Sequence, residues 1–442
     1  MQLRSCPPFR PHRQHAAGAG SIWISIVIWI FLRAGPLELL AEEELSLKWK
    51  ATEASQTLGG HITRRLAVST NTPSSAKKLP PGVTAAWFGE LRIGPREKQE
   101  SRLVLLDEPK NGPARLFVDS NGDGDFTNDP GATWTKKSTP GSAGTMVSIY
   151  VGEAKVTFPF EHGPREGQVG FSRRDRSDGA AGVPNELYYF REYFLLGRLK
   201  LGDKTYRAAL VDEYVRGDFR GEEDPEFSGV RLFFDFNDDS TFELTRESVD
   251  VRKPFNLGGT TWEVADLTAE GEFRFQRSSK TAPEIVVAPN LNRGRKAISF
   301  VAKTTDGGST RFPEDYKGKV VLLDFWATWC GPCLAEIPNV VQNYQKYHER
   351  GFEVLGISLD QAETVPKLAA FLKQKNMTWR QVADGKGWQA EVAQRYAVSS
   401  IPFMLLINGD TGEILGREGE VRGENLGPAI EAALPAKKKA SR

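Results

Sequence analysis

The sequence predicts a multi-domain protein in which a mostly β N-terminal region precedes an α/β C-terminal domain. Its 442 residues exceed the roughly 250 to 300 residues at which a single hydrophobic core usually stops growing. Between residues 42 and 275, short alternating runs are broken by Gly, Pro, Asn and Asp, which is typical of strands and turns. From residue 320, a buried-strand pattern is followed directly by a helical one, which favours an α/β domain.

The first 41 residues have the pattern of an export signal. Residues 21–32 are an apolar run preceded by arginines; it is too short to span a bilayer comfortably, which takes about 20 apolar residues, but suits the core of a secretory signal. Neither Ala34 nor Ala41 ends a good small-x-small cleavage site, so an uncleaved anchor is the alternative. We expect residues 1–41 to be a signal peptide or signal anchor. In either case the rest of the chain would be exported, to the periplasm or the outer face of the cytoplasmic membrane. An uncleaved anchor would in addition tether the chain to the membrane.

Charge and cysteine content narrow the function classes. Lysine and arginine total 58, aspartate and glutamate total 57, and the net charge is +1, so nucleic-acid binding is not expected. Three cysteines, Cys6, Cys330 and Cys333, are too few for a disulfide-stapled scaffold. Without the N-terminal signal, the two remaining cysteines belong to one motif.

The β-rich region, residues 42–275, repeats part of its own sequence. Residues 115–123 match residues 231–239, and Phe126 and Phe242 follow the two copies at corresponding positions. We therefore expect two related β units.

The first copy contains a candidate calcium loop. Glycine at position 6 and an apolar residue at position 8 follow the calcium-loop pattern, and position 12 is Pro130 where that pattern has a bidentate glutamate. The second copy, from Asp235, has lost the glycine. The alternative is an Asx-rich turn that binds nothing. The candidate ligands, at positions 1, 3, 5 and 7, are Asp119, Asn121, Asp123 and Asp125.

The C-terminal part divides into a linker, a domain and a tail. Residues 276–295 lose the strand pattern and are rich in Ser, Pro and Asn, which predicts a linker. A domain is expected over residues 296–435, followed by a basic tail over residues 436–442.

A pair of cysteines carries the chemistry of this domain. Residues 320–326 predict a central buried strand, and after a turn Cys330 is expected to begin a helix with Pro332 in its first turn. The positive end of the helix dipole favours a thiolate over a thiol, so Cys330 is the predicted nucleophile. Cys333 lies one turn deeper and is expected to resolve the mixed disulfide.

These residues resemble a known family. Residues 325–333, Phe-Trp-Ala-Thr-Trp-Cys-Gly-Pro-Cys, resemble the active-site segment of thioredoxins. The domain over residues 296–435 resembles the exported TlpA and ResA type of thiol-disulfide oxidoreductase. The resemblance implies a thioredoxin-like fold and a redox-active Cys330–Cys333 disulfide that requires no cofactor.

The same resemblance implies roles for three further residues. Asp324 matches the buried aspartate that helps to move the proton of the second cysteine, and Glu336 matches a glutamate beside the active site of ResA-like members. Pro402 matches the cis-proline that faces the cysteine pair. The strand at residues 352–359 lacks the lysine that thioredoxins place beside the aspartate, and an inserted helix and short strand follow it.

We therefore expect a thiol-disulfide oxidoreductase that reduces protein disulfides outside the cytoplasm. The Gly331-Pro332 dipeptide is that of thioredoxin, whose potential is about −270 mV, against about −120 mV for the strong periplasmic oxidant. The implied partners are disulfide-bearing proteins and, as electron donor, a membrane thiol transporter. One alternative is a calcium-stabilised β-rich surface binding module with the thioredoxin-like domain as an accessory. A thiol peroxidase is disfavoured because Thr328 lies two, not three, residues before Cys330.

Overall fold

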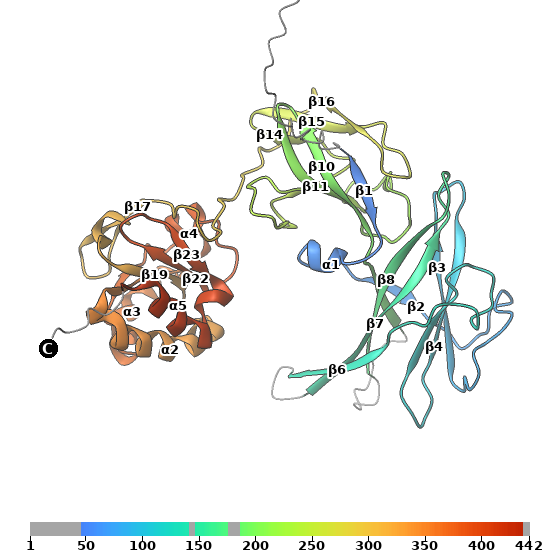
Figure 1. Ribbon diagram of the computed structural model, residues 1–442, viewed down its shortest axis with the longest axis horizontal. Coiled ribbons are helices and arrows are strands. Elements are labelled where there is room, and N and C mark those ends of the chain that lie inside the picture. Colours follow the sequence, from blue (N-terminus) through green and yellow to red (C-terminus); the bar gives the residue numbers. More distant parts are fainter. Residues whose placement is uncertain (1–45, 141–145, 176–185, 436–442) are drawn as a thin grey trace, which may run out of the picture. The chain divides into compact units, whose positions relative to one another are not determined.

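The structure is a computed structural model that describes residues 46–140, 146–175 and 186–435 (Figure 1). The predicted signal segment, residues 1–41, and the predicted basic tail, residues 436–442, lie outside these ranges. Within the described ranges, no helix combines the length and the apolar character that a membrane crossing requires. Export and tethering therefore stay predictions from the sequence.

The N-terminal region is built from antiparallel sheets, which confirms its mostly β character. One five-stranded sheet contains, in order, β1 (Leu47–Lys50), β10 (Phe194–Leu201), β11 (Lys204–Asp212), β12 (Val230–Phe234) and β13 (Ser248–Asp250). A second contains β2 (Arg64–Ala67), β9 (Glu186–Arg191), β8 (Arg165–Arg174), β7 (Met146–Phe158) and β6 (Thr135–Pro140). Two three-stranded sheets contain β3 (Ala86–Ile93), β4 (Glu100–Asp107) and β5 (Arg115–Val118), and β14 (Phe255–Leu257), β15 (Thr260–Ala265) and β16 (Arg274–Arg277). A short helix, α1 (Ala54–Thr57), precedes β2.

The two matching sequence segments occupy equivalent places in this region. Strands β3, β4 and β5 pair as an antiparallel meander, and so do β10, β11 and β12. The third strand of each meander carries the matching segment and is followed by the loop that begins at Asp119 or Asp235. After each loop a phenylalanine, Phe126 or Phe242, is buried in a small hydrophobic cluster of its own. The repeated sequence therefore corresponds to a repeated strand–loop arrangement.

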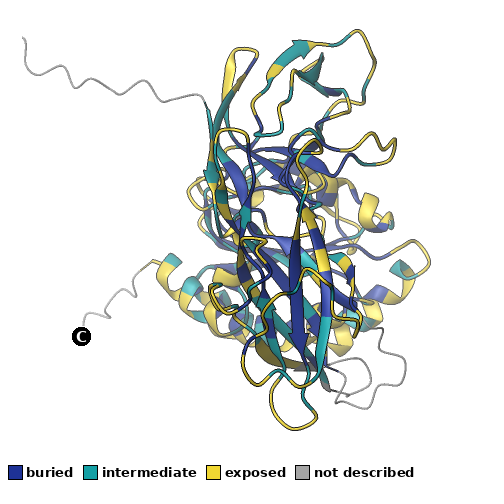
Figure 2. Ribbon diagram, turned by 90° about the vertical axis from the view of Figure 1, so that its right-hand side faces the viewer, coloured by how far each residue is buried: buried dark blue, intermediate teal, exposed yellow. Residues whose placement is uncertain are grey.

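The five-stranded sheets of the β-rich region share a hydrophobic core. Trp49 of β1 stacks on Tyr193, with ring centroids 5.0 Å apart, and packs edge-on against Phe158 of β7 at 6.1 Å. Phe158 and Phe171 are fully buried. Figure 2 shows the resulting pattern, with buried residues along the strands and exposed residues in the connecting loops.

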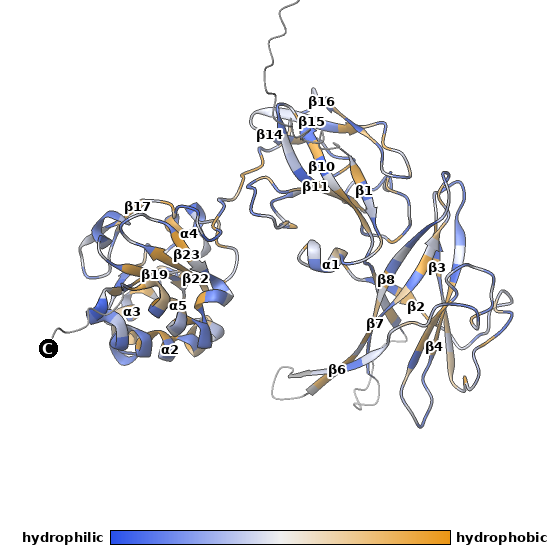
Figure 3. Ribbon diagram, in the orientation of Figure 1, coloured by the Kyte–Doolittle hydropathy of each residue, from blue (hydrophilic) through white to orange (hydrophobic). Residues whose placement is uncertain are grey.

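The C-terminal domain contains a mixed five-stranded sheet. Its central strand, β19 (Val320–Trp326), is buried at every residue, which explains its continuous apolar sequence. It pairs in parallel with β20 (Phe352–Ser358) and antiparallel with β22 (Phe403–Asn408). The outer strands are β21 (Arg380–Val382), parallel to β20, and β23 (Ile414–Arg417), antiparallel to β22. Figure 3 shows hydrophobic residues concentrated on the central strands of this sheet.

Helices and a hairpin complete the C-terminal domain. The hairpin consists of β17 (Phe300–Lys303) and β18 (Ser309–Phe312). The helices are α2 (Gly331–Tyr347), α3 (Val365–Gln374), α4 (Glu391–Arg395) and α5 (Leu426–Ala433), and α2 packs on α5 and β20. Short 3-10 turns are η2 (Glu314–Tyr316), η3 (His348–Arg350), η4 (Gly387–Gln389), η5 (Glu418–Val421) and η6 (Gly423–Asn425). The predicted inserted helix and short strand are α3 and β21.

The predicted linker differs slightly from the observed elements at both ends. Strand β16 extends to Arg277, two residues into the expected linker. Near the other end, Gly294 N donates to Ile414 O at 2.8 Å, so this part of the segment already pairs with the C-terminal domain. Hydrogen-bonded pairing of this kind does not produce a compositional signal, whereas the Pro- and Asn-rich stretch between these ends does.

Candidate active site

The two cysteines of the exchange motif lie at the start of α2 and form a disulfide. The sequence led us to expect Cys330 as the first helical residue; in the structure it is the N-cap, one position before the first helical residue, Gly331, and Pro332 lies in the first turn. Cys333 N donates to Cys330 Sγ at 3.2 Å, so a free backbone N–H of the helix end faces the sulfur. This position favours negative charge on Cys330 when the disulfide is reduced.

A buried aspartate that the sequence analysis missed holds the loop before Cys330. Asp360, fully buried just after β20, accepts hydrogen bonds from Thr328 N at 3.1 Å and Thr328 Oγ1 at 2.5 Å. Ser358 Oγ also donates to it at 2.8 Å. Thr328, the residue considered for a peroxidase, is thus part of the support of the loop. An acid directly after a buried strand was the available sequence signal.

The two tryptophans near the motif have different environments. Trp326 is buried, and its Nε1 donates to Gln381 Oε1 at 3.0 Å, so it is a packing residue. Trp329, next to Cys330, is 51% exposed. Its ring centroid lies 5.9 Å from that of Trp388, which is also exposed and comes from η4 in the inserted segment. An exposed aromatic pair therefore lies beside the cysteines, and no local sequence signal indicates that Trp388 belongs to it.

Asp324 lies in the middle of β19 and is buried without a hydrogen-bond partner for its Oδ1 among the described residues. Burial, reinforced by the negative field of Glu336 and opposed by Arg422, raises the pKa of Asp324 to about 7. A carboxyl group with this pKa changes its protonation state near neutral pH. It is therefore suited to accept or release a proton there.

Glu336 is buried on α2, three residues after Cys333, and is not the solvated charge that is usual on a helix. Its Oε1 accepts from Asn339 Nδ2 at 2.7 Å and from Gly423 N at 2.9 Å. Its Oε2 lies 3.7 Å from Nε of Arg422, which stands between η5 and η6. The carboxyl group is thus fixed by contacts to its own helix and to the segment after β23.

Pro402 lies near the cysteine pair, directly before β22. The Ile401–Pro402 peptide bond is cis, and Ile401 O is 3.7 Å from Cys330 Sγ. A hollow of about 450 Å³ adjoins this loop, with Pro332, Pro402 and Arg422 among its lining residues. The structure therefore places the Ile401–Pro402 loop next to Cys330, which is bonded to Cys333.

The structure does not support the predicted calcium site at Asp119, Asn121, Asp123 and Asp125. Asp119 accepts from Gly122 N and Gly124 N at 2.8 and 3.0 Å, and the side-chain oxygens of Asn121, Asp123 and Asp125 each accept from the backbone N–H two residues on. These are Asx turns, in which the loop satisfies its own acceptors. Among the described residues, no group of three or more His, Cys, Asp or Glu side chains could hold a metal ion. The calcium half of the alternative binding-module hypothesis is unsupported for the same reason.

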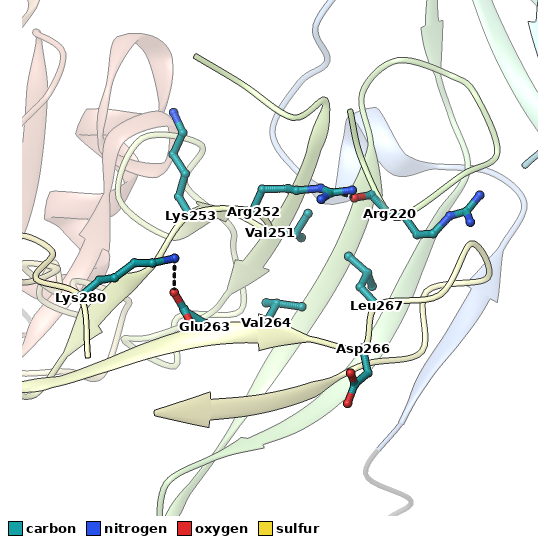
Figure 4. A pocket seen from close by; sticks show the side chains of 9 residues that line it. All are labelled: Arg220, Val251, Arg252, Lys253, Glu263, Val264, Asp266, Leu267 and Lys280. Atoms are coloured by element: carbon teal, nitrogen blue, oxygen red, sulfur yellow. Dashed lines mark hydrogen bonds and ion pairs between the residues drawn. The ribbon is translucent and has the colours of Figure 1, made fainter. Parts of the chain in front are cut away.

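A hollow in the β-rich region, lined by several cations, gives no evidence of an anion site (Figure 4). Lys280 Nζ is 2.8 Å from Glu263 Oε1, and Arg252 Nε donates to Arg220 O at 2.9 Å. Lys253 Nζ donates to Glu226 O. Because these cations already bond to protein acceptors, they are not preorganised for a ligand.

The C-terminal domain is similar to known proteins. Residues 293–414 match the AhpC/TSA family. The thiol-disulfide oxidoreductase ResA of Bacillus thuringiensis subsp. konkukian is 32% identical over 142 residues, which cover 32% of this chain and 79% of that protein. ResA of Geobacillus thermodenitrificans is 32% identical over 146 residues, or 32% of this chain and 78% of that protein. The thioredoxin domain of a thiol-disulfide oxidoreductase from Bacteroides vulgatus is 28% identical, covers 33% of this chain and 99% of that chain, and has a TM-score of 0.29.

The family match and the ResA relatives confirm the predicted resemblance and the predicted enzyme class. The matched region, residues 293–414, contains the Cys330–Cys333 disulfide and the central strands of the mixed sheet that positions it. Each of these relatives covers about a third of the chain, and the family match lies in its C-terminal part. Through its C-terminal domain, the chain belongs to the thioredoxin-like thiol-disulfide oxidoreductases of the ResA family.

Proposed function

We propose that the protein reduces the disulfides of other proteins outside the cytoplasm, with Cys330 as nucleophile and Cys333 as resolving cysteine. The observation that carries the proposal is the position of the pair. Cys330 caps the N-terminus of α2, within hydrogen-bond distance of Cys333 N and next to the Ile401–Pro402 loop. A thiolate at this position is stabilised, and the neighbouring Pro332 and Ile401 line a surface hollow.

The reaction begins from the reduced pair. The Cys330 thiolate attacks one sulfur of the substrate disulfide, the substrate S–S bond breaks, and the other substrate sulfur leaves as a thiolate. Cys333 then loses its proton and attacks Cys330 Sγ in the mixed disulfide. The Cys330–Cys333 bond forms, and the substrate leaves with both sulfurs reduced. Two electrons pass from the cysteine pair to the substrate in each turnover.

Three neighbouring residues assist these steps in the proposed scheme. Asp324, with a pKa of about 7, accepts the proton of Cys333 during resolution. Glu336 adds negative charge beside Asp324 and thereby raises the pKa of that acid. Pro402 shapes the loop that presents its backbone to the extended substrate segment around the disulfide.

The location outside the cytoplasm rests on the sequence of residues 1–41, where an apolar run follows basic residues. In an oxidising compartment the Cys330–Cys333 pair must be re-reduced after every turnover. We therefore propose a membrane thiol transporter as electron donor. If residues 1–41 form an uncleaved anchor, the domain would work at the membrane surface, close to this donor.

The redox potential of the cysteine pair tests the reductant assignment. We expect equilibration of the purified protein with glutathione buffers to give a value close to the roughly −270 mV of thioredoxin, because the two proteins share the Gly-Pro dipeptide between the cysteines. The fraction of oxidised pair can be followed by thiol alkylation and mass spectrometry. A value near the roughly −120 mV of strong oxidants would contradict the reductant role and favour an oxidase.

A further inference from the structure

The buried Asp324 has a cationic neighbour that its own sheet does not provide. The strand beside it, β20, places Gly356 opposite Asp324, and β22 places Met404 opposite it on the other side. Neither residue is charged. Arg422 comes instead from the segment between η5 and η6, far along the chain from β19. Its guanidinium favours the ionised form of Asp324.

We propose that Arg422 is a positioning residue for the exchange reaction: it holds Glu336 beside Asp324 and supplies the positive charge that thioredoxins take from a lysine on the neighbouring strand. This inference rests on the proposed function of the Cys330–Cys333 pair.

The geometry around Glu336 supports a positioning role. Arg422 Nε approaches Glu336 Oε2 at 3.7 Å, while the adjacent Gly423 N donates to Glu336 Oε1 at 2.9 Å. Two consecutive residues of one segment therefore contact the two oxygens of one buried carboxyl group. Since Asn339 Nδ2 binds the same Oε1 at 2.7 Å, the Glu336 side chain is fixed from both its own helix and the opposing segment.

The charges that act on Asp324 come from two elements and have opposite signs. Glu336 on α2 raises the pKa of Asp324, and Arg422 lowers it. The flanking strands present the uncharged residues Gly356 and Met404. Among the described residues, Glu336 and Arg422 are therefore the two charges with a resolved effect on Asp324. Removal of either charge should therefore move the titration of Asp324 in a direction set by its sign.

Arg422 also lies at the hollow beside the Ile401–Pro402 loop. Its side chain is 39% exposed and lines the same hollow as Pro332 and Pro402. Glu336, on the other side of the contact, has a side chain that is only 11% exposed. Arg422 thus contacts a buried carboxyl group and also lines the hollow in which we expect the substrate to dock.

A pH profile of the resolution step tests the proposal. The reduced full chain reacts with a disulfide peptide in single-turnover experiments, and the rate of resolution is measured as a function of pH. The acid limb is the low-pH part of this profile, where the rate falls as Asp324 becomes protonated. We expect Arg422→Gln to shift the acid limb to higher pH by at least about 0.5 unit, because a positive charge near Asp324 is lost. Arg422→Lys should restore part of the shift. Glu336→Gln should move the limb in the opposite direction, to lower pH.

A matched control and a second readout separate positioning from general damage. Arg395→Gln removes a partly exposed arginine that pairs with Glu391 in the same domain, and should leave the acid limb in place. In denaturant unfolding, the free energy of unfolding of Arg422→Gln should fall further above about pH 7 than that of the wild type. The reason is that loss of the positive charge raises the pKa of Asp324 in the folded state again, so the decrease in stability with pH continues to a higher pH. In an Asp324→Asn background this additional pH-dependent loss should disappear.

The outcomes distinguish this inference from the proposed function. If the wild-type protein does not exchange disulfides, the proposed function fails, and the unfolding series still tests the electrostatic link. If the wild-type protein is active and Arg422→Gln has an unchanged pH profile, the inference about Arg422 is overturned. The same conclusion follows if Arg422→Gln and Glu336→Gln shift the acid limb in the same direction.

Discussion

Replacement of Cys330 by serine is expected to lower kcat/KM for protein-disulfide reduction by at least about 10³-fold, as is usual when a covalent nucleophile is removed. A serine hydroxyl is un-ionised at neutral pH and cannot form a disulfide with the substrate. The N–H groups at the start of α2 then have no thiolate to stabilise. Reduction of an insulin-type substrate with a chemical thiol as electron source measures the effect.

The control for this variant is Trp388→Phe, which keeps an aromatic ring beside Trp329 and leaves both cysteines intact. Its rate should stay within a few-fold of the wild type. Circular dichroism before the assay establishes that Cys330→Ser is folded. Retention of most of the activity by folded Cys330→Ser would show that another group is the nucleophile.

Asp324→Asn is expected to stabilise the protein at pH 8 by about 2 to 4 kcal/mol, since each unit of pKa shift corresponds to about 1.4 kcal/mol. Burial raises the pKa of Asp324 from an ordinary 3.8 to about 7 in the folded state. As pH rises through this interval, the unfolded chain releases its proton before the folded chain does. The free energy of unfolding of the wild type therefore falls between about pH 4 and pH 7, and asparagine cannot ionise.

Denaturant unfolding at pH 4 and pH 8 measures this effect. The two proteins should have similar stability at the lower pH and diverge at the higher one. Glu363→Gln, at an exposed position of the same domain, is the charge-matched control and should show no comparable divergence. Equal pH dependence in the wild type and Asp324→Asn would mean that Asp324 titrates in the folded state as it does in the unfolded chain.

The C-terminal domain could be predicted from the sequence because local signals determine its central elements. The apolar run at residues 320–326 is long and uninterrupted, since both faces of β19 are covered. The β-rich region could be assigned only to a class. Its first strand, β1, pairs with β10, and such long-range antiparallel pairing has no local signature in the sequence.

The candidate site shows the same division. Cys330, Cys333 and Asp324 belong to one continuous segment, so the motif predicted their proximity. Asp360 contacts Thr328 from a distant part of the chain, and its place directly after a buried strand was the available signal. Arg422 contacts Glu336 from still farther along the chain, and an arginine in a loop carries no signal of such a contact. The structure does not support the calcium pattern, because spacing alone does not show whether side-chain oxygens face a cation or, as here, the loop's own N–H groups.

Trapping of the mixed disulfide tests the central claim most directly. Cys333→Ser, reduced and mixed with a peptide that contains one disulfide, should accumulate a covalent complex, because Cys330 can attack but nothing resolves the bond. Mass spectrometry of the digested complex should locate the linkage at Cys330, and the reciprocal Cys330→Ser variant should give little complex. Two results would contradict the assignment of Cys330 as the nucleophile. One is that Cys330→Ser forms a complex through Cys333 at a comparable rate, and the other is that Cys333→Ser forms no complex.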